Sequence, residues 1–425
     1  MDNNLTVSDR MHSRPDSSTR SLSADMLATK TSAPCGGQPY TRPLSPFERM
    51  WLAAQTTCGM TLVEGHGRLS ASDLRNAVHI ASSANPGSRL KLAGYGPAAR
   101  WMESDIFPTI TEVDAGDWDG CGPEGAPFSD VVHMDPGNGP SASYVLVQGP
   151  LPRLIQRTHH ATMDGLGAMQ FLEDVFRAMR GEAVIGAHGA ETDLDLARSL
   201  QGRSRRTANL ALNPFGKSSN GQSGSSWCRI RVPCRGARQP LARTLMALAA
   251  AARRHGVGDV LIDIPVNLRN SFPALRNTGN LTGSLRLSIA PQASVESIQE
   301  DIRSQLAANR QADAIVASAG CRYLPIAVMR YAARTMARRA VARNEFSPSA
   351  AVSNLGRVPL DKFSTADFQA RSTIVIPPGY DGVPLFLVMS GNDDGLDLCA
   401  RAPLALGSDG RLKKLLEEIA SAFTQ

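Results

Sequence analysis

The chain has 425 residues, of which 42% are hydrophobic, and a formal net charge of +6. This length favours two or three domains, and the longest apolar run, near residues 245–252, is far too short to span a bilayer. Seven scattered cysteines without a Cys-x-x-Cys pair argue against a disulfide framework or a zinc site, so we expect no metal and a cytoplasmic location.

Basic residues are unevenly distributed along the chain. No carboxylate occurs between Asp195 and Asp259, yet this stretch holds 12 lysines and arginines. A second acid-free stretch, from Asp313 to Glu345, holds six arginines. Such local fields attract acidic partners or phosphates, although a solvated linker and a solvated helix face explain them equally well. Aromatic residues are sparse in both stretches and show no regular interleaving with the basic residues, so we expect no nucleic-acid binding.

The first half of the chain alternates strands and helices after a polar tail. Residues 1–41 are polar and without periodicity, which predicts disorder. Periodicity and turn residues then predict, in chain order, a strand at 61–68, a helix from Leu69, a loop at 113–140, and a hairpin of two strands at 142–148 and 151–157.

The stretch 157–165, Arg-Thr-His-His-Ala-Thr-Met-Asp-Gly, lies where the last of these strands gives way to a helix predicted over 166–179. Adjacent residues on a strand point to opposite faces, so only one of His159 and His160 faces a given cavity. A metal needs converging ligands, which disfavours a metal site here. The alternative to a catalytic role is a pair of buried histidines before a helix that Asp164 caps.

The second half repeats the mixture of strands and helices after a Gly- and Ser-rich connection. The sequence divides into a tail at 1–41, a first lobe at 42–190, a linker or crossover at 191–226, and a second lobe at 227–425. For the second lobe we predict strands at 227–233, 260–266, 281–289, 386–389 and 396–400, and helices at 241–254, 295–308, 326–342 and 412–423.

The pattern His-His-x-x-x-Asp-Gly resembles the signature of the condensation-domain acyltransferase superfamily, which includes condensation domains of nonribosomal peptide synthetases and wax-ester and polyketide-associated acyltransferases. Shorter matches support the resemblance. They are the opening Ser45 to Leu52, the turn at Asn85 to Leu90 with Asn85 in place of a histidine, Pro265 to Arg269 with Gly279-Asn280, and the strand end with Ser353 and Asn354.

The resemblance implies roles for individual residues. His160 is the implied catalytic histidine, next to His159, and Gly165 lets a substrate approach the backbone. Asp164 is implied to be structural and to pair with an arginine, for which Arg269 is the first candidate and Arg286 the second. Ser353 and Asn354 are implied to lie beside the active-site tunnel and to contact substrate.

The resemblance also implies the fold and the reaction. We expect an α/β protein in which two mixed-sheet lobes form a V-shaped pseudo-dimer, similar to chloramphenicol acetyltransferase, with a tunnel between them and His160 at its middle. The expected reaction moves an acyl group from a thioester donor to an amine or hydroxyl acceptor, with His160 as general base or orienting group. Specialised-metabolite assembly is the expected setting.

We expect a monomer without a bound cofactor. The acyl donor is expected on phosphopantetheine of an acyl or peptidyl carrier protein or on coenzyme A, and the acceptor to be a small molecule. Two alternatives stay open: a non-catalytic protein of the same fold that binds carrier-attached chains, and a hydrolase or cyclase that uses the same histidine. The predicted helix 326–342 is expected to border the donor entrance. Its exposed stripe is expected to consist of Arg330, Arg334 and Arg338. Its buried side is expected to consist of Ile326, Met329 and Met336.

Overall fold

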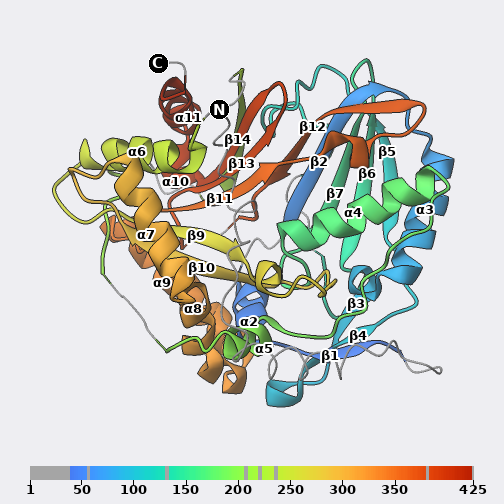
Figure 1. The fold of residues 1–425 in the computed structure, drawn as a ribbon, viewed down its shortest axis with the longest axis horizontal. Coiled ribbons are helices and arrows are strands. Elements are labelled where there is room, and N and C mark those ends of the chain that lie inside the picture. Colours follow the sequence, from blue (N-terminus) through green and yellow to red (C-terminus); the bar gives the residue numbers. More distant parts are fainter. Residues whose placement is uncertain are drawn as a thin grey trace.

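The computed structural model describes residues 39–54, 58–129, 134–204, 209–218, 223–233, 238–379 and 382–423. The tail predicted over residues 1–41 lies outside these ranges up to residue 38, and the first strand, β1 (Thr41–Pro43), begins at its end. Two lobes of mixed sheet and helix follow, and Figure 1 shows them side by side. None of the helices in the described ranges is long and apolar enough to cross a membrane.

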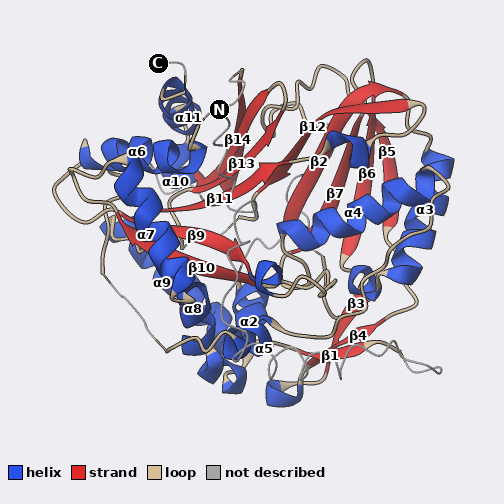
Figure 2. Ribbon diagram, in the orientation of Figure 1, coloured by secondary structure: helices blue, strands red, loops and turns tan. Residues whose placement is uncertain are grey.

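A five-stranded mixed sheet forms the centre of the first lobe (Figure 2). In spatial order it contains β12 (Phe368–Ile376), β2 (Cys58–Gly67), β7 (Arg153–His159), β6 (Ala142–Gln148) and β5 (Thr109–Asp114). Strand β5 runs parallel to β6, and the other neighbours are antiparallel. Helices α3 (Ala71–Ala84) and α4 (Gly165–Met179) bury one apolar face each against the sheet, through Leu74, Val78, Phe171 and Val175 among others. The predicted hairpin and the helix after it are confirmed.

The second lobe is built on a six-stranded mixed sheet. In spatial order it contains β10 (Thr282–Ser288), β9 (Leu261–Asn267), β11 (Ala350–Arg357), β13 (Phe386–Asn392), β14 (Gly395–Pro403) and β8 (Ser225–Val232). Strand β11 is parallel to both of its neighbours. A common core joins this sheet to the helices α6 (Pro240–Arg253), α7 (Val295–Ala307) and α11 (Arg411–Ser421). The three helices contribute Leu245, Ile298 and Leu416, respectively, among others. The elements predicted for this half are confirmed, with small shifts at their ends.

A three-stranded sheet and further helices complete the fold. Strands β4 (Arg100–Glu103) and β3 (Leu90–Ala93) join β1 in the order β1-β4-β3. The helices are α2 (Pro46–Ala53), α5 (Asp193–Ser199), α8 (Asp313–Ala317), α9 (Ile326–Arg343) and α10 (Leu404–Gly407). Helix α2 begins with a capping box, because Ser45 and Glu48 each accept a hydrogen bond from the backbone of the other. Helix α5 lies within the segment 191–226 predicted as a linker or crossover, and was not predicted as a helix.

Helix α9 lies against α2, and its outer face is largely exposed. Arg330 donates a hydrogen bond from Nη2 to the carbonyl oxygen of Leu52 at the end of α2, at 3.2 Å. The prediction that Met336 covers the buried side is wrong, because its side chain is 69% exposed. Ile326 and Met329 are half-buried. Periodicity places these three residues on one face, but α2 has 8 residues and α9 has 18, so the covering surface ends before Met336.

Strand β12 belongs to the second half of the chain but lies in the sheet of the first lobe. Its residues Phe368 to Ile376 pair antiparallel with Gly67 to Met60 of β2. The boundaries predicted for the lobes, 42–190 and 227–425, stay a prediction. The exchange of β12 shows that the two sheets are not each made from one continuous stretch of chain.

A buried network of charges ties the two sheets together. Glu64 on β2 pairs with Arg153 on β7 at 3.1 Å and with Arg229 on β8 at 2.9 Å. Arg229 also pairs with Asp397 on β14 at 2.9 Å. Burial alone raises the pKa of Glu64, but the two guanidinium groups outweigh it and hold the pKa below its usual value. The carboxylate therefore stays charged and fixes β2 against the second lobe.

Candidate active site

The predicted strand-to-helix junction is present in the first lobe. Strand β7 ends at His159, residues 160–164 form the connection, and α4 begins at Gly165. Asp164 caps the helix, since its Oδ1 accepts a hydrogen bond from the backbone N–H of Gly167 at 2.7 Å. His160 lies beyond the end of the strand, so the expectation that the two histidines alternate across a strand does not describe their geometry.

His159 orders the turn. Its side chain is 4% exposed, and its Nδ1 accepts a hydrogen bond from the backbone N–H of Ala161 at 3.2 Å. Its carbonyl oxygen accepts hydrogen bonds from the backbone N–H and the hydroxyl of Thr162, at 2.9 and 2.7 Å. Burial, and then the neighbouring His160, lower the pKa of His159 to about 4. Its Nδ1 is thus occupied by the turn itself.

His160 is the histidine that the turn leaves partly exposed. Its ring and that of Trp51 from α2 form a T-shaped pair, with ring centroids 4.2 Å apart and planes at 84°. Its carbonyl oxygen accepts a hydrogen bond from Nδ2 of Asn280 at 2.7 Å. Burial lowers the pKa of the ring to about 4, against the opposing effects of Asp164 and the backbone of Met163. The imidazole is therefore neutral near pH 7 and available to accept a proton.

Asp164 joins the two lobes through a buried ion pair. Its Oδ2 lies 2.9 Å from Nη1 of Arg269, and each side chain is 4% exposed. The same oxygen accepts hydrogen bonds from the backbone N–H of Leu281 at 2.8 Å and from the hydroxyl of Thr282 at 2.9 Å. Burial alone raises the pKa of Asp164, but Arg269 and the backbone donors hold it below its usual value. The carboxylate thus anchors the start of α4 to β10 and to the turn that carries Arg269.

Two glycines at the start of α4 have different surroundings. A Cβ on Gly165 would approach only Cγ1 of Val375, at 3.9 Å, within 4 Å. A Cβ on Gly167 would lie 2.2 Å from the carbonyl oxygen of Thr278 in the second lobe. Packing therefore requires a glycine at Gly167. At Gly165 the missing side chain leaves open space beside the backbone at the start of α4.

Of the two candidate partners of Asp164, the structure brings only Arg269 to it. Arg286 instead makes two parallel contacts with Asp263, Nε to Oδ1 at 2.7 Å and Nη2 to Oδ2 at 2.8 Å. Asn85, the residue in place of the family's histidine, donates from Nδ2 to Asp174 at 2.8 Å and is fully buried. Its side chain holds the turn after α3 and contacts Ala81 and Asp174, not the histidines.

Ser353 and Asn354 lie on β11 of the second lobe. Both are half-buried, and Oδ1 of Asn354 accepts a hydrogen bond from the backbone N–H of Gly356 at 3.0 Å. Within the described ranges no hydrogen bond joins either side chain to His160 or Asp164. A substrate contact for these two residues stays a prediction.

Two cavities formed by the described residues lie away from the histidine turn. One is lined by Arg254 and Lys414 among others, and the other by Ser225 and Arg401 among others. The tunnel expected at His160 therefore stays a prediction. Across the described part of the chain, no group of three or more His, Cys, Asp and Glu side chains is placed to hold a metal ion.

Comparisons with known proteins match this chain by structure alone. No protein-family model matches it, and no curated protein does. The condensation domain of the Monacolin K polyketide synthase MokA is 14% identical with a TM-score of 0.57, over 91% of this chain and 98% of that chain. The first condensation domain of the CDA synthetase is 15% identical with a TM-score of 0.57, over 91% and 96%. This chain has the condensation-domain fold.

The condensation-domain fold confirms the predicted architecture of two mixed α/β lobes similar to chloramphenicol acetyltransferase. The epimerization domain from the third module of tyrocidine synthetase B also matches, at 12% identity and a TM-score of 0.51, over 92% of this chain and 98% of that chain. Domains named for different reactions thus share the condensation-domain fold, and the reaction has to be argued from the residues of the site.

Trp51 and Asn280 are site residues that sequence analysis did not identify. Both occur in segments that matched the condensation-domain pattern, the opening motif and the pair Gly279-Asn280. The structure shows why they matter, since Trp51 supports the ring of His160 and Asn280 holds its carbonyl oxygen. The signal in the sequence was the spacing of the motifs, but only the fold brings the three segments together.

Proposed function

We propose that the protein is a condensation-type acyltransferase that moves an acyl group from a thioester donor to an amine or hydroxyl acceptor. The observation that carries the proposal is a neutral, partly exposed His160 whose turn is held from the second lobe by Arg269 and Asn280. The structural likeness to synthetase condensation domains supports the proposal. Specialised-metabolite biosynthesis, of nonribosomal peptides, polyketides or lipids, is the setting that fits this likeness.

The proposed reaction requires little covalent machinery. A thioester is already activated, so the enzyme has to align two substrates and handle one proton. The acceptor nitrogen or oxygen attacks the thioester carbonyl, and the imidazole of His160 takes the proton that the acceptor loses. The C–S bond then breaks, and the leaving sulfur takes this proton from the imidazolium. A ring with a pKa of about 4 in the free protein is a weak base, so orienting the acceptor by accepting its hydrogen bond is the second proposed role.

Neighbouring residues have supporting roles in this proposal. Asp164 acts as a positioning residue, because its carboxylate is fully engaged by Arg269 and by backbone and hydroxyl donors. Gly165 leaves room for a substrate to approach the backbone. Trp51 fixes the ring plane of His160 from one side. Ser353 and Asn354 are proposed to contact substrate from the second lobe.

The donor is proposed to arrive along helix α9. This helix lies against α2, which carries Trp51 next to His160, and Arg334 and Arg338 on it are exposed. A thioester on coenzyme A or on the phosphopantetheine arm of a carrier protein brings phosphate groups, which exposed arginines attract. The acceptor is proposed to be a small molecule, and the protein to act as a monomer.

Product analysis with a panel of substrates tests the proposal. The full chain is incubated with acyl groups of several lengths, each supplied on coenzyme A and on a phosphopantetheinylated carrier protein, together with amine and alcohol acceptors. Mass spectrometry identifies acylated acceptors, and a thiol reagent measures thiol release. We expect His160→Ala to lower turnover by about 10²–10⁴-fold without a change in melting temperature. His188→Ala, at an exposed histidine outside the site, should keep the wild-type rate.

The outcomes separate the proposed transfer from its alternatives. Thiol release without an acylated acceptor, abolished in His160→Ala, indicates a hydrolase that uses the same histidine. A product formed by ring closure of the acyl chain indicates a cyclase. Saturable binding of acyl carrier protein without any turnover indicates a binding protein. Normal transfer by His160→Ala refutes the proposed role of this residue.

A further inference from the structure

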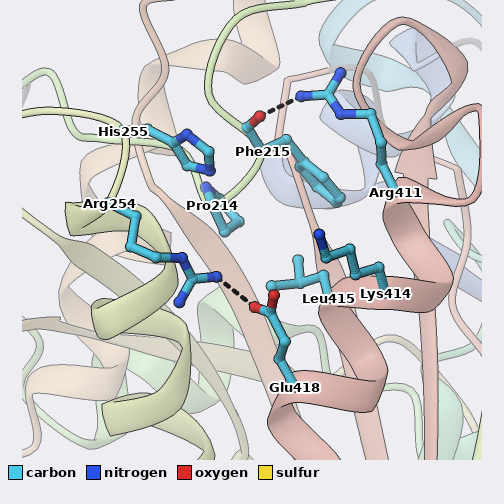
Figure 3. Close-up of a pocket in the computed structure, with 8 residues that line it drawn as sticks. All are labelled: Pro214, Phe215, Arg254, His255, Arg411, Lys414, Leu415 and Glu418. Atoms are coloured by element: carbon cyan, nitrogen blue, oxygen red, sulfur yellow. Dashed lines mark hydrogen bonds and ion pairs between the residues drawn. The ribbon is translucent and has the colours of Figure 1, made fainter.

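A basic cavity of about 200 Å³ lies in the second lobe, and none of its lining residues belongs to the candidate active site (Figure 3). Three segments meet there. The loop before β8 contributes Phe215, the end of α6 contributes Arg254 and His255, and α11 contributes Arg411 and Lys414 along one side. Figure 3 shows the basic side chains arranged around the hollow.

Positive charge in the basic cavity exceeds negative charge by two. Arg254, Arg411 and Lys414 are cationic, and Glu418 is the one carboxylate among the lining residues. Glu418 is paired with Arg254. Arg411 donates to the carbonyl oxygens of Phe215 and Lys217, which leaves its charge uncompensated. Within the described residues no carboxylate forms an ion pair with Arg411 or Lys414.

The amino-acid sequence around the basic cavity accounts for part of this excess of positive charge. The segments around Phe215 and Arg254 come from the stretch between Asp195 and Asp259, which contains no carboxylate at all. No side chain from this stretch can therefore supply a compensating negative charge. The acid-free stretch between Asp195 and Asp259 thus contributes part of the wall of the basic cavity.

The wall of the basic cavity also has an apolar part. Phe215 is buried, and the guanidinium of Arg411 lies 5.9 Å from the centre of its ring. Leu415 lies on the same side of α11 as Arg411 and Glu418 and completes the apolar wall. A ligand that fills this space therefore needs both an anionic group and an apolar body.

We propose that the basic cavity binds a small phosphate monoester with a compact aromatic or apolar body. A phosphate monoester carries a charge of about −1.5 to −2 near pH 7, which matches the two uncompensated cations Arg411 and Lys414. Guanidinium groups suit phosphate oxygens through paired N–H donors. The volume exceeds what a free phosphate ion fills, so Phe215 and Leu415 are left to contact the organic part. This inference is independent of the proposed acyl transfer.

Calorimetric titration with phenyl phosphate at low salt tests the inference. We expect saturable binding at one site per chain. Lys414→Gln should weaken it by roughly 5–10-fold, and Glu418→Gln should tighten it by a similar factor, because each removes one charge close to the phosphate. Lys413→Gln is the matched control, since Lys413 is an exposed neighbour on the same helix that does not line the basic cavity. All three positions are on the accessible side of α11, so the variants should fold.

Titrations with inorganic phosphate and with phenol separate the two parts of the ligand. Both should bind more weakly than phenyl phosphate. The inference is overturned if phenyl phosphate does not saturate, if Lys413→Gln weakens binding as much as Lys414→Gln, or if Glu418→Gln weakens it. Equal affinity for inorganic phosphate overturns the monoester assignment. Equal affinity for phenol overturns the role of the cations.

Discussion

Replacing Asp164 removes the buried ion pair that joins the first lobe to the second at the candidate active site. In Asp164→Ala, the guanidinium of Arg269 keeps oxygen acceptors on Asn267, Asn277 and Gly279 but loses its carboxylate partner. Arg269 is 5% exposed, so water cannot replace the lost charge. Breaking a buried pair from one side costs about 3–5 kcal/mol. The lost helix cap adds about 1 kcal/mol.

The expected loss of stability is therefore on the order of 5 kcal/mol. An unfolding entropy of about 2.1 cal/mol/K per residue converts this into a fall of roughly 6 °C in the melting temperature of a chain of this size. Asp164→Asn keeps the shape of the side chain and part of the helix cap, so it should lose somewhat less stability than Asp164→Ala. Differential scanning calorimetry at pH 7 measures both variants against the wild type.

The matched control is Asp263→Ala, whose ion pair with Arg286 has similar distances but side chains 23% and 28% exposed. Solvent screens this half-buried pair more than the fully buried pair of Asp164, so this variant should lose clearly less stability than Asp164→Ala. The pKa of Asp164 is held below its usual value, so the advantage of the wild type should be constant above about pH 4 and vanish at lower pH. Equal melting of the Asp164 and Asp263 variants would refute the reasoning.

Three other sites give predictions of different kinds. Burial raises the pKa of Asp193 to about 7, so its contribution to stability is full below about pH 4 and is lost as the pH rises through 7. Asp193→Asn should thus match the wild type at pH 4 and exceed it by on the order of 4 kcal/mol at pH 8 in urea unfolding. Gly167→Ala should clash with the carbonyl of Thr278 and lose about 1–3 kcal/mol in the same assay, together with turnover. Reversing Arg334 and Arg338 to Glu should raise the KM for the donor about 5–10-fold at low salt, with kcat nearly unchanged.

Each of these three has a control of the same chemical kind. Asp105→Asn, at an exposed carboxylate, should show no gain at pH 8. Gly320→Ala should be neutral in packing, because no atom lies within 4 Å of its Cβ position. The double charge reversal of exposed Arg68 and Arg75 should leave donor kinetics unchanged. A stability gain that does not depend on pH, a harmless Gly167→Ala, or equal kinetics of the two double variants would contradict the corresponding prediction.

The histidine turn could be predicted because its determinants are local. The end of the strand, the two histidines and the aspartate that caps the next helix all lie within residues 153–167, and several of the hydrogen bonds of the turn form within this segment. Contacts between distant segments could not be derived from periodicity. Trp51 and His160 are more than a hundred residues apart, so their contact depends on how the chain between them folds. The exposure of Met336 could not be derived from periodicity either. Periodicity shows that residues share a face of a helix, but not whether another helix covers that face.

Strand β12 has a consequence for any attempt to divide the protein. A fragment that ends at residue 226 lacks β12, so one side of β2 from Met60 to Gly67 loses its hydrogen-bonding neighbour. Leu62 and Val63 in this edge are fully buried in the intact protein. Open apolar edges pair readily with other chains. The first fragment is therefore expected to aggregate alone and to stay monodisperse when co-expressed with residues 227–425, which makes the chain a candidate for fragment complementation.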